Sequence, residues 1–412
     1  MTGPTIAPVG VSAGLYGLVA ASVGDLDAHL RSLGAWPRLD PSAIVALART
    51  AGLTGRGGAG FPTARKLESV AAAPGGPAVV IANGGEGEPC SGKDAYLLRH
   101  GPHLVLDGVQ LAARAVGARQ AHVYARDAGS GDAVAAALAE RARAGLDTVP
   151  VEVVEASGTF VAGQESAAAA AVQGRPAVPS GAPERVFERG VRRRPTLVQN
   201  VETLAHLALL ARRGPAWYRS VGVPEDPGTF LATLGGAVVR PGVVEAPHGM
   251  SLGDLLAIGG GLSEPVRAVL LGGYFGTWLT WPDHADVPLA RPWLRPLGAD
   301  LGAGVVLALP TRVCGLVAGA QIARYLADAS AQQCGPCLFG LPRVADLLAR
   351  LAACETSPGL PTEIERVISM VRGRGACAHP DGAARFVHST VTTFDDEVRH
   401  HLRGGCTVRR AV

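Results

Sequence analysis

The sequence has little net charge. Its 412 residues carry a formal charge of only +3, and its basic residues form no run longer than Arg192 to Arg194. A protein that binds a nucleic-acid backbone usually concentrates Lys and Arg on one face. We therefore expect no nucleic acid among its partners.

Long apolar runs and an export signal are missing as well. The longest apolar stretch, residues 301–320, is interrupted by Pro310 and Arg312, whereas a membrane-spanning helix needs about 20 mostly apolar residues. No Lys or Arg precedes Arg31, so the basic segment that opens a secretory signal is not seen. We expect a globular, cytoplasmic protein with no direct membrane insertion.

Lysine is the scarcest basic residue. Lys66 and Lys93 are the only two among 38 basic residues, and both lie in glycine-rich segments. Because an ammonium group is a compact point charge and a guanidinium is a planar fork, these positions favour a site that needs the former, although chance placement would also explain them. The seven cysteines, without an export signal, indicate reduced thiols or metal ligands rather than structural disulfides.

The hydrophobic pattern divides the chain into four parts. Predicted strands alternate with predicted helices between residues 45 and 220, which is typical of a parallel sheet covered on both faces. A smaller β-plus-helix unit follows over residues 228–285, and helical periodicity over 300–403 predicts a bundle. Residues 1–44 form an N-terminal extension. The predicted helices cover residues 41–51, 102–116, 132–146, 165–173, 200–213, 251–258, 314–329, 343–352, 363–371 and 395–402, and the first predicted strands lie at 78–82, 121–125 and 149–154.

A glycine-rich segment follows the first of these helices. Gly55, Gly57 and Gly60 have the spacing G-x-G-x-x-G, but a dinucleotide-binding Rossmann motif needs a strand directly before the glycines, and a helix is predicted there. Bare backbone at these positions would let amide groups approach a phosphate or a flat ring, with Lys66 supplying positive charge. A flexible turn is the alternative.

Three further polar motifs stand at predicted element ends. Asn83-Gly-Gly-Glu86-Gly-Glu88 follows a predicted strand, at the sheet edge where ligands of α/β proteins usually bind. AGQES places Glu165 at a helix start, and QNVET does the same for Asn200. Amide and carboxylate groups can bind a ring edge or ribityl hydroxyls, but solvated loop acids and ordinary helix caps also account for them.

Taken together, GRGGAGFPT, NGGEGEP with KD, AGQES and QNVETLA, in this order, resemble the NADH-oxidising flavoprotein subunit of respiratory complex I and its soluble hydrogenase and formate dehydrogenase relatives. The resemblance covers roughly residues 45–400. It implies a Rossmann-like α/β domain for flavin mononucleotide (FMN), a small β-grasp-like domain of the SLBB type, and a helical domain carrying an iron–sulfur site. By this resemblance the flavin contacts are Gly57, Gly58, Gly60, Lys66, Asn83, Glu86, Gly163, Glu165, Asn200 and Thr203, and the NADH contacts are Phe61, Glu88 and Phe160.

The sequence departs from the family pattern at several positions. An acidic residue, a second acid and an Asn of the family are replaced by Gly85, Gln164 and Gln199, and the positions that stack on and clamp adenine are Ser69, Ala182 and Arg185. Stacking of a base on an aromatic side chain contributes about 1–3 kcal/mol. NADH use is therefore a hypothesis at this stage.

The cysteines near the C-terminus suggest a redox or metal site. Cys334-Gly-Pro-Cys337 alone matches a thioredoxin dithiol, but a helix rather than a strand is predicted before it, and a closed zinc site would need a second close pair. The family holds a [4Fe–4S] cluster with C-x-x-C-x-x-C and a fourth cysteine further on, which Cys334, Cys337 and Cys377 match, while Ala331 stands at the first position. We expect Cys406 to supply the fourth ligand, with Cys354 and His379 as weaker choices and with Cys90 and Cys314 as packed thiols.

Three functions follow from this pattern. The favoured one is oxidation of NAD(P)H through FMN, with electrons passed to a [4Fe–4S] cluster and then to a ferredoxin-like or other iron–sulfur partner protein; such a chain could also sit peripherally on a membrane complex. The second is an FMN and iron–sulfur relay that does not use nicotinamide. The third is an assembly protein that keeps the fold without cofactors.

Overall fold

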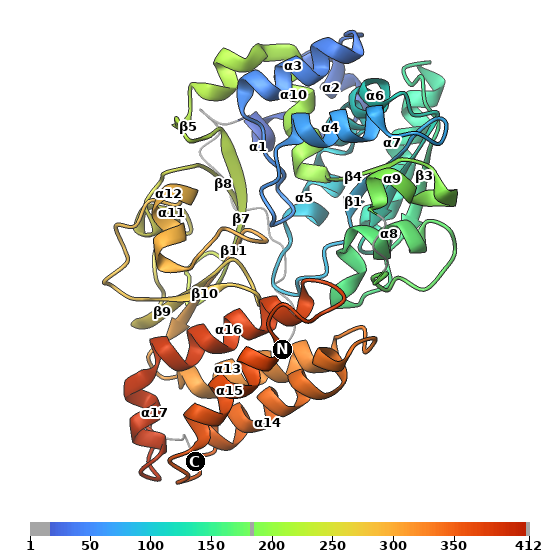
Figure 1. The fold of residues 1–412 in the computed structure, drawn as a ribbon. Helices are drawn as coiled ribbons and strands as arrows, with labels where there is room; N and C mark the ends of the chain where they lie inside the picture. Colours follow the sequence, from blue (N-terminus) through green and yellow to red (C-terminus); the bar gives the residue numbers. More distant parts are fainter. Residues whose placement is uncertain (1–16, 182–184, 409–412) are drawn as a thin grey trace.

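The computed structural model describes residues 17–181 and 185–408. It has a parallel α/β domain, a second domain built on a five-stranded sheet, and a helical C-terminal domain (Figure 1). This confirms the predicted fold class. In the part of the chain that the structure describes, no helix is both long and apolar enough to cross a membrane.

The first domain is built on a parallel sheet with strand order β3-β2-β1-β4. Its central strand β1 is almost completely buried, as expected of a parallel strand covered on both faces. Helix α6 is buried along nearly its whole length and ends at Gly117, which adopts a left-handed conformation. The strands are β1 (Val79–Gly84), β2 (Gln120–Ala125), β3 (Val151–Glu155) and β4 (Thr196–Asn200). The helices are α3 (Pro41–Ala51), α4 (Thr63–Ala72), α5 (Lys93–His100), α6 (Pro102–Val116), α7 (Ala128–Arg143), η1 (Phe160–Gly163), α8 (Glu165–Ala171), α9 (Val186–Arg189), η2 (Val191–Arg193) and α10 (Val201–Arg219).

The N-terminal residues pack onto this domain where the structure describes them. Helices α1 (Gly17–Ala21) and α2 (Leu26–Leu33) precede α3, and Leu18 and Trp36 belong to the same apolar core as α10. Helix α3 begins at Pro41, so the expected boundary at residue 44 falls inside a helix. Residues 1–16 of the expected extension lie outside the described residues.

The second domain extends further than the sequence indicates. Its sheet has the order β10-β9-β11-β7-β8, and β11 lies at its centre, parallel to β7 and antiparallel to β9. The boundary expected at residue 285 is therefore wrong, because the sheet needs β11 to join its two halves. Its elements are β7 (Thr229–Gly236), β8 (Gly242–Pro247), α11 (Leu252–Ile258), β9 (Val266–Leu271), β10 (Thr277–Thr280), α12 (Arg291–Leu294), η3 (Arg295–Leu297) and β11 (Val305–Pro310), preceded by the short pair β5 (Gly222–Val223) and β6 (Asp226–Pro227).

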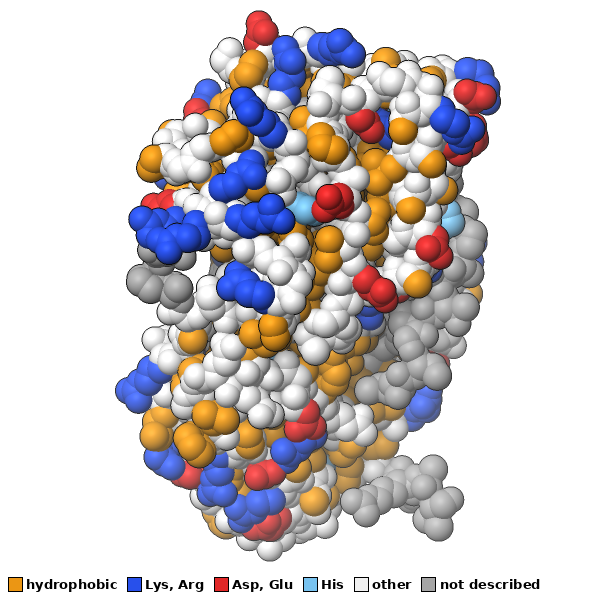
Figure 2. All heavy atoms as spheres, turned by 90° about the vertical axis from the view of Figure 1, so that its right-hand side faces the viewer, with side chains coloured by type: hydrophobic (Ala, Val, Ile, Leu, Met, Phe, Trp, Pro, Cys, Tyr) orange, Lys and Arg blue, Asp and Glu red, His pale blue; other side chains and the backbone are white. Residues whose placement is uncertain are grey.

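The third domain is a bundle that packs against the second sheet (Figure 1). Helix α16, which the hydrophobic pattern did not predict, contacts β10 through a hydrogen bond of 2.8 Å from the Trp278 amide to the Ser389 hydroxyl. Figure 2 shows basic side chains gathered on one side of the upper part of the molecule and acidic ones on its other side, with both signs of charge on the part below. The helices are α13 (Gly315–Asp328), the π-helical turn η4 (Pro336–Gly340), α14 (Leu341–Ala352), α15 (Leu360–Val371), α16 (His379–Thr393) and α17 (Asp395–His401).

Candidate functional site

The ends of two neighbouring strands and the glycine-rich loop form one cavity. Asn83 on β1 and Asn200 on β4 are direct partners across the parallel sheet, and each stands at the carboxyl end of its strand. The loop between α3 and α4 lies in front of them, and together they border a cavity of about 690 Å³. This volume lies in the range of ligand pockets, about 300–1,000 Å³. Eleven of the predicted site residues line it, namely Gly57, Gly58, Gly60, Phe61, Lys66, Asn83, Glu88, Phe160, Gly163, Glu165 and Asn200.

Left-handed backbone and hydrogen bonds fix the loop. Gly58 and Gly60 have φ angles of +103° and +59°, which glycine adopts without strain. Arg291 from the second domain donates to the Thr54 hydroxyl at 2.6 Å and to the Gly60 carbonyl at 3.4 Å. The same guanidinium pairs with buried Asp226 at 2.7 Å. The second domain therefore holds the loop in place.

Thr203 supports the loop from behind rather than lining the cavity. It is fully buried, and its hydroxyl accepts a hydrogen bond of 2.9 Å from the Arg56 amide. The Arg56 side chain is anchored by the Tyr218 hydroxyl at 2.8 Å. The expectation that Thr203 contacts the flavin is corrected, because the loop itself lies over this side chain.

Lys66 and Glu165 pair across the rim of the cavity. Lys66, on the first turns of α4, forms an ion pair with Glu165 at the start of α8. The Glu165 side chain is half exposed and Lys66 is partly so. The pair therefore places one positive and one negative group where a ligand can displace or bridge them.

Asn83 and Asn200 differ in the capacity they leave for a ligand. Asn83 donates to the Gly163 carbonyl at 2.8 Å, which brings η1 to the end of β1. Asn200 donates to Asp94 at 2.6 Å and to the Asn83 carbonyl at 3.3 Å, and its oxygen accepts from the Glu202 amide at 3.0 Å. Because an Asn side chain has two donors and one acceptor oxygen, Asn200 is nearly saturated by the protein. Asn200 therefore holds neighbouring groups of the site in position, and its side chain has little hydrogen-bonding capacity left for a ligand.

Two acidic residues of the β1 loop are buried. Glu86 accepts hydrogen bonds from Ser91 and from the Asp94 amide at the start of α5, and burial followed by the nearby Asp94 charge raises its pKa to about 7. Glu88 accepts from the Tyr274 amide at 2.7 Å, and burial raises its pKa to about 7. Glu86 borders a second cavity of about 240 Å³, which adjoins the first and shares Asn83, Phe160 and Asn200 with it.

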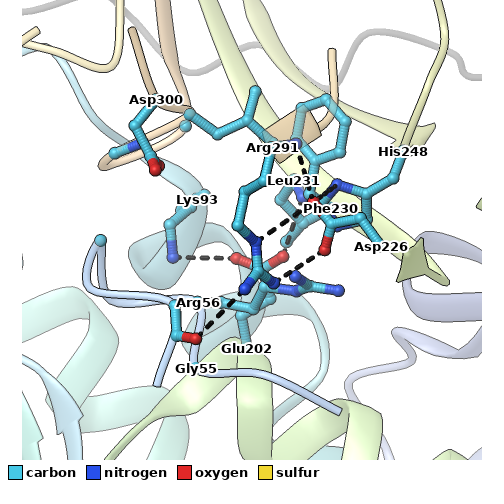
Figure 3. Close-up of a pocket in the computed structure, with 15 residues that line it drawn as sticks. Gly55, Arg56, Lys93, Glu202, Asp226, Phe230, Leu231, His248, Arg291 and Asp300 are labelled. Carbon is cyan, nitrogen blue, oxygen red and sulfur yellow. Dashed lines mark hydrogen bonds and ion pairs between the residues drawn. The ribbon is translucent and has the colours of Figure 1, made fainter. Parts of the chain in front are cut away.

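Behind the loop, Lys93 is enclosed by acids. Figure 3 shows Lys93 and Glu202 pointing toward each other beside Arg56, in a narrow pocket of about 40 Å³. The Lys93 ammonium lies 2.6 Å from Asp94 and 2.9 Å from Glu202. Burial alone would lower the pKa of Lys93, but Asp94 and Glu202 outweigh it and raise the pKa above its usual value. Lys93 is thus a buried structural cation, whereas Lys66 faces the cavity.

An aromatic group connects the two cavities to the helical domain. The ring centroids of Phe160 and Phe275 are 4.8 Å apart, and those of Phe275 and His379 are 5.4 Å apart. Phe275, His379 and Arg385 border the cavities, yet sequence motifs did not connect them with the flavin site. They come from the second and third domains, so no local motif indicates them.

Three cysteines gather at the start of α14 and α16. Cys334 lies two residues before η4, Cys337 lies within it, and Cys377 lies two residues before α16. Burial, followed by the charges of Cys334 and Cys377, raises the pKa of Cys337 to about 12. Cys377 also borders the smaller cavity together with Glu86 and Asn83. The cysteine group and the glycine-rich cavity are therefore adjacent.

Cys406 is not part of this group. Its sulfur lies within 4.8 Å of ligand atoms of Cys314 and His401. Cys314 precedes the first residue of α13, whereas Cys334 follows its last turn, and the 14 residues of α13 span about 21 Å at about 1.5 Å per residue. The expectation that Cys406 completes the cluster is wrong, because the chain after α17 turns back toward the opposite end of α13.

The comparisons with known proteins agree with this geometry. Residues 48–209 match the Nuo51 FMN-binding domain, residues 231–273 the SLBB domain, and residues 318–401 the NADH-ubiquinone oxidoreductase-F iron–sulfur binding region. The chain is 32% identical to an F-type subunit of the NADH-quinone oxidoreductase of Rhizobium meliloti, over 88% of this chain and 89% of that protein. The chain belongs to the family of F-type subunits of NADH-quinone oxidoreductase.

Further relatives extend the comparison. The F-type subunit of Streptomyces coelicolor is 30% identical over 89% of this chain and 84% of that protein. Among solved structures, an NAD⁺-reducing [NiFe]-hydrogenase in its air-oxidised state is similar, with a TM-score of 0.81 and 31% identity over 88% of this chain. The matched region spans 63% of that hydrogenase chain.

The cavity fits the FMN of this family. A Cβ atom at Gly57 would meet only the Asn200 Cβ at 3.5 Å, so this glycine leaves the space in front of the loop open. A Cβ atom at Gly163 would lie 2.5 Å from the Gly85 carbonyl, so a glycine there lets η1 pack closely against the loop after β1. The departure at Gly85 also has a structural counterpart, because a Cβ there would lie 2.4 Å from the Tyr124 ring.

Two other departures from the family pattern, Gln164 and Gln199, border the large cavity. Gln164 caps α8 by accepting from the Ser166 amide at 2.8 Å, and Gln199 is buried on β4. The Ser69 hydroxyl donates to the Arg65 carbonyl at 2.8 Å, and Arg185 precedes the first residue of α9. Ala182 lies outside the described residues.

Proposed function

We propose that the chain oxidises NADH with FMN held in the large cavity and passes the electrons through a [4Fe–4S] cluster at Cys334, Cys337 and Cys377. The observation that carries this proposal is that Cys377 and Asn83 border one cavity, although they come from different domains. Bound FMN takes up a hydride and releases electrons singly, and an iron–sulfur cluster carries single electrons. The adjacency of the two sites gives the electrons a short route.

The protein's own part is binding and orientation. Gly57, Gly58 and Gly60 expose backbone amides where the flavin phosphate binds, and Lys66 adds a positive charge at the same rim. Asn83, at the end of β1, and Glu86, in the loop after it, form hydrogen bonds with the flavin ring and the ribityl hydroxyls. Gly163 lets η1 approach the Gly85 carbonyl and so closes the opposite wall of the cavity. Glu165 would contact the flavin once its ion pair with Lys66 opens.

The nicotinamide contacts are proposed on the exposed side of the cavity. Phe61 is 47% exposed there, with the Arg65 guanidinium 5.9 Å from its ring centroid. Phe160 lines the inner wall against Phe275. We place the nicotinamide between these rings, with Glu88 fixing its amide, so an exposed aromatic ring is available to stack on the nucleotide even though Ser69 cannot.

The fourth cluster position needs a ligand other than cysteine. Ala331 has no donor, and Cys406 lies elsewhere. We propose His379, because its Nε2 is 2.7 Å from the Leu326 carbonyl while its buried Nδ1 has no hydrogen-bond partner among the described residues. A ring nitrogen left with a lone pair two residues after Cys377 suits iron.

The partner is proposed to be an iron–sulfur electron-transfer protein, with the chain held peripherally in a larger complex. Leu338 and Phe339, directly after Cys337, are 46% and 75% exposed. Large apolar side chains beside a redox centre suit docking of another protein. Relatives named as subunits of a quinone oxidoreductase support this placement.

An anaerobic titration tests the main proposal. Excess NADH should bleach the flavin absorbance first and then reduce the iron–sulfur absorbance. Bleaching by dithionite but by neither NADH nor NADPH would overturn nicotinamide oxidation and favour the relay without nicotinamide. Protein isolated without flavin or iron, and unable to bind FMN, would favour an assembly role.

A further inference from the structure

A second group of metal-ligating side chains lies at the far end of the helical domain. Cys314 stands just before α13, His401 is the last residue of α17, and Cys406 follows five residues later. Their Sγ and imidazole atoms all lie within 4.8 Å of one another. Within residues 17–181 and 185–408, no other group of three or more Cys, His, Asp or Glu residues meets this spacing. In Figure 1 α17 lies at the end of the helical domain, away from the loop between α3 and α4.

The histidine is oriented as a metal ligand is. His401 is fully buried, and its Nδ1 lies 2.9 Å from the Leu351 carbonyl, to which it donates. Its Nε2 therefore carries a lone pair and lies 3.5 Å from the Cys314 sulfur. Metal-binding histidines characteristically donate their second ring nitrogen to a carbonyl or carboxylate in this manner.

The spacing suits one tetrahedral ion. With Zn–S near 2.3 Å and Zn–N near 2.0–2.1 Å, tetrahedral geometry puts sulfur and nitrogen about 3.5 Å apart and two sulfurs about 3.8 Å apart. The Cys314–His401 distance of 3.5 Å matches the first of these values.

A turn after α17 brings Cys406 back toward Cys314 and His401. Gly404 has a φ of +80°, and its amide donates to the His401 carbonyl at 2.9 Å, while the Gly405 amide donates to the His400 carbonyl at 3.1 Å. The Gly405 carbonyl lies 3.4 Å from the Cys354 sulfur. This turn reverses the chain and carries Cys406 back over the end of α17.

A buried carboxylate lies beside Cys314. Glu397 is buried, and its Oε2 lies 3.1 Å from the Cys314 sulfur and accepts from the Gly315 amide at 2.9 Å. Arg267 pairs with the other carboxylate oxygen. Glu397 is not one of the residues whose ligand atoms all lie within 4.8 Å of one another, so its side chain has to rotate to reach an ion bound there.

We propose that Cys314, His401 and Cys406 bind a single Zn²⁺, with the neighbouring Glu397 rotating into the fourth position, in a structural site that fastens the C-terminal segment to the ends of α13, α14 and α17. Two thiolates, one imidazole and one carboxylate are ligands that zinc takes in a closed tetrahedral site. The ion is separate from the iron–sulfur cluster, so this proposal does not depend on the proposed electron transfer.

Metal analysis of the full-length protein, purified anaerobically and dialysed against EDTA, tests the site. We expect one zinc per chain in the wild type and almost none in Cys406→Ser or His401→Gln, with iron and flavin contents unchanged in both. Cys354→Ser is the matched control, because this sulfur neighbours the turn but lies outside the ligand group, and it should keep its zinc. With Co²⁺ in place of Zn²⁺, the wild type should show thiolate-to-cobalt charge transfer that Cys406→Ser loses.

Four outcomes would overturn the proposal. They are a wild type without zinc that also fails to take up added Zn²⁺ or Co²⁺, unchanged zinc in Cys406→Ser, loss of iron instead of zinc in that variant, and a Cys314–Cys406 disulfide found by mass spectrometry of the anaerobic protein. Cys406 lies outside the helices, so its replacement tests the site even if His401→Gln does not fold.

Discussion

Removal of the buried Lys93 ammonium tests whether its contacts with Asp94, Glu202 and Asn200 stabilise the site. Lys93 is 3% exposed, and its ammonium lies 2.6 Å from Asp94, 2.9 Å from Glu202 and 3.4 Å from the Asn200 oxygen. Lys93→Met keeps the volume of the side chain but leaves two buried carboxylates without their cation. Breaking a buried pair from one side costs about 3–5 kcal/mol.

The expected result is a large loss of thermal stability. For a domain of this size about 2–4 °C is lost per kcal/mol, so the melting temperature of Lys93→Met should fall by about 10 °C. FMN content should fall as well, because Lys93 and Asp94 both hold Asn200 at the cavity wall. Melting followed by circular dichroism, with flavin quantified after release, measures both.

The chain supplies its own control. Lys66→Met removes the only other lysine, but its partner Glu165 is half exposed, and such pairs contribute about 0–1 kcal/mol. Its melting temperature should therefore stay close to that of the wild type. Adding Glu202→Gln to Lys93→Met removes one of the two orphaned charges and should restore part of the stability.

The comparison is made at pH 8, where Lys93→Met leaves the Asp94 and Glu202 carboxylates buried without their cation. A melting temperature within about 2 °C of the wild type at pH 8, where about 10 °C is expected, would refute the reasoning.

Three other changes test neighbouring parts of the site. Burial raises the pKa of Glu88 from 4.5 to about 7, as it does for Glu86, so wild-type stability should fall as pH rises through that window. Glu88→Gln should remove the share of this fall that comes from Glu88, leave the share from Glu86, and gain up to about 3 kcal/mol on the wild type at pH 8. Denaturant unfolding at pH 5 and pH 8 measures it, and an unaltered pH dependence would contradict the assignment. Gly57→Ala adds a methyl group whose only neighbour within 4 Å is the Asn200 Cβ; we expect a folded protein that binds FMN about 10–100-fold more weakly, as for overpacking of about 1–3 kcal/mol. Gly131→Ala on α7 should bind FMN normally in the same fluorescence titration, and equal affinities for both variants would place the flavin elsewhere. Cys337→Ser should abolish the iron–sulfur absorbance while keeping the flavin and its reduction by NADH, whereas Cys406→Ser should keep both chromophores; the opposite pattern in the absorbance spectra would restore Cys406 as a cluster ligand.

Local patterns were sufficient for the elements and motifs that depend on near neighbours. Helix α3 runs from Pro41 to Ala51 as its N-terminal proline and closing Gly52 indicate. Asn83 stands at the end of β1 and lines the cavity, because a buried apolar run followed by polar residues indicates the ligand edge of a parallel sheet. The Gln164 side chain shows the limit of such patterns, since it borders the cavity while its oxygen caps α8.

Elements and residues whose role depends on contacts with distant parts of the sequence were not predicted. Strand β4 is five residues long and passes directly into α10, so only the helix was predicted there, over residues 200–213, and the short strand before it was not. Strand β11 belongs to the second sheet through pairing with β7 and β9, which lie far from it in the sequence. Phe275 and Arg385 reach the cavity from other domains and belong to no motif.

The sequence by itself determined the family, the fold class, the glycine-rich loop and most of the residues that border the cavity, because backbone conformation and hydrophobic periodicity are local properties of the chain. Only the tertiary structure decided that Thr203 supports the loop from behind, that Lys93 is a buried structural cation, and that Cys406 joins Cys314 and His401 rather than Cys334. These roles depend on which residues a turn or a helix brings together over long sequence separations. The direction in which Gly404 reverses the chain, and the length of α13 between Cys314 and Cys334, set the cysteine grouping.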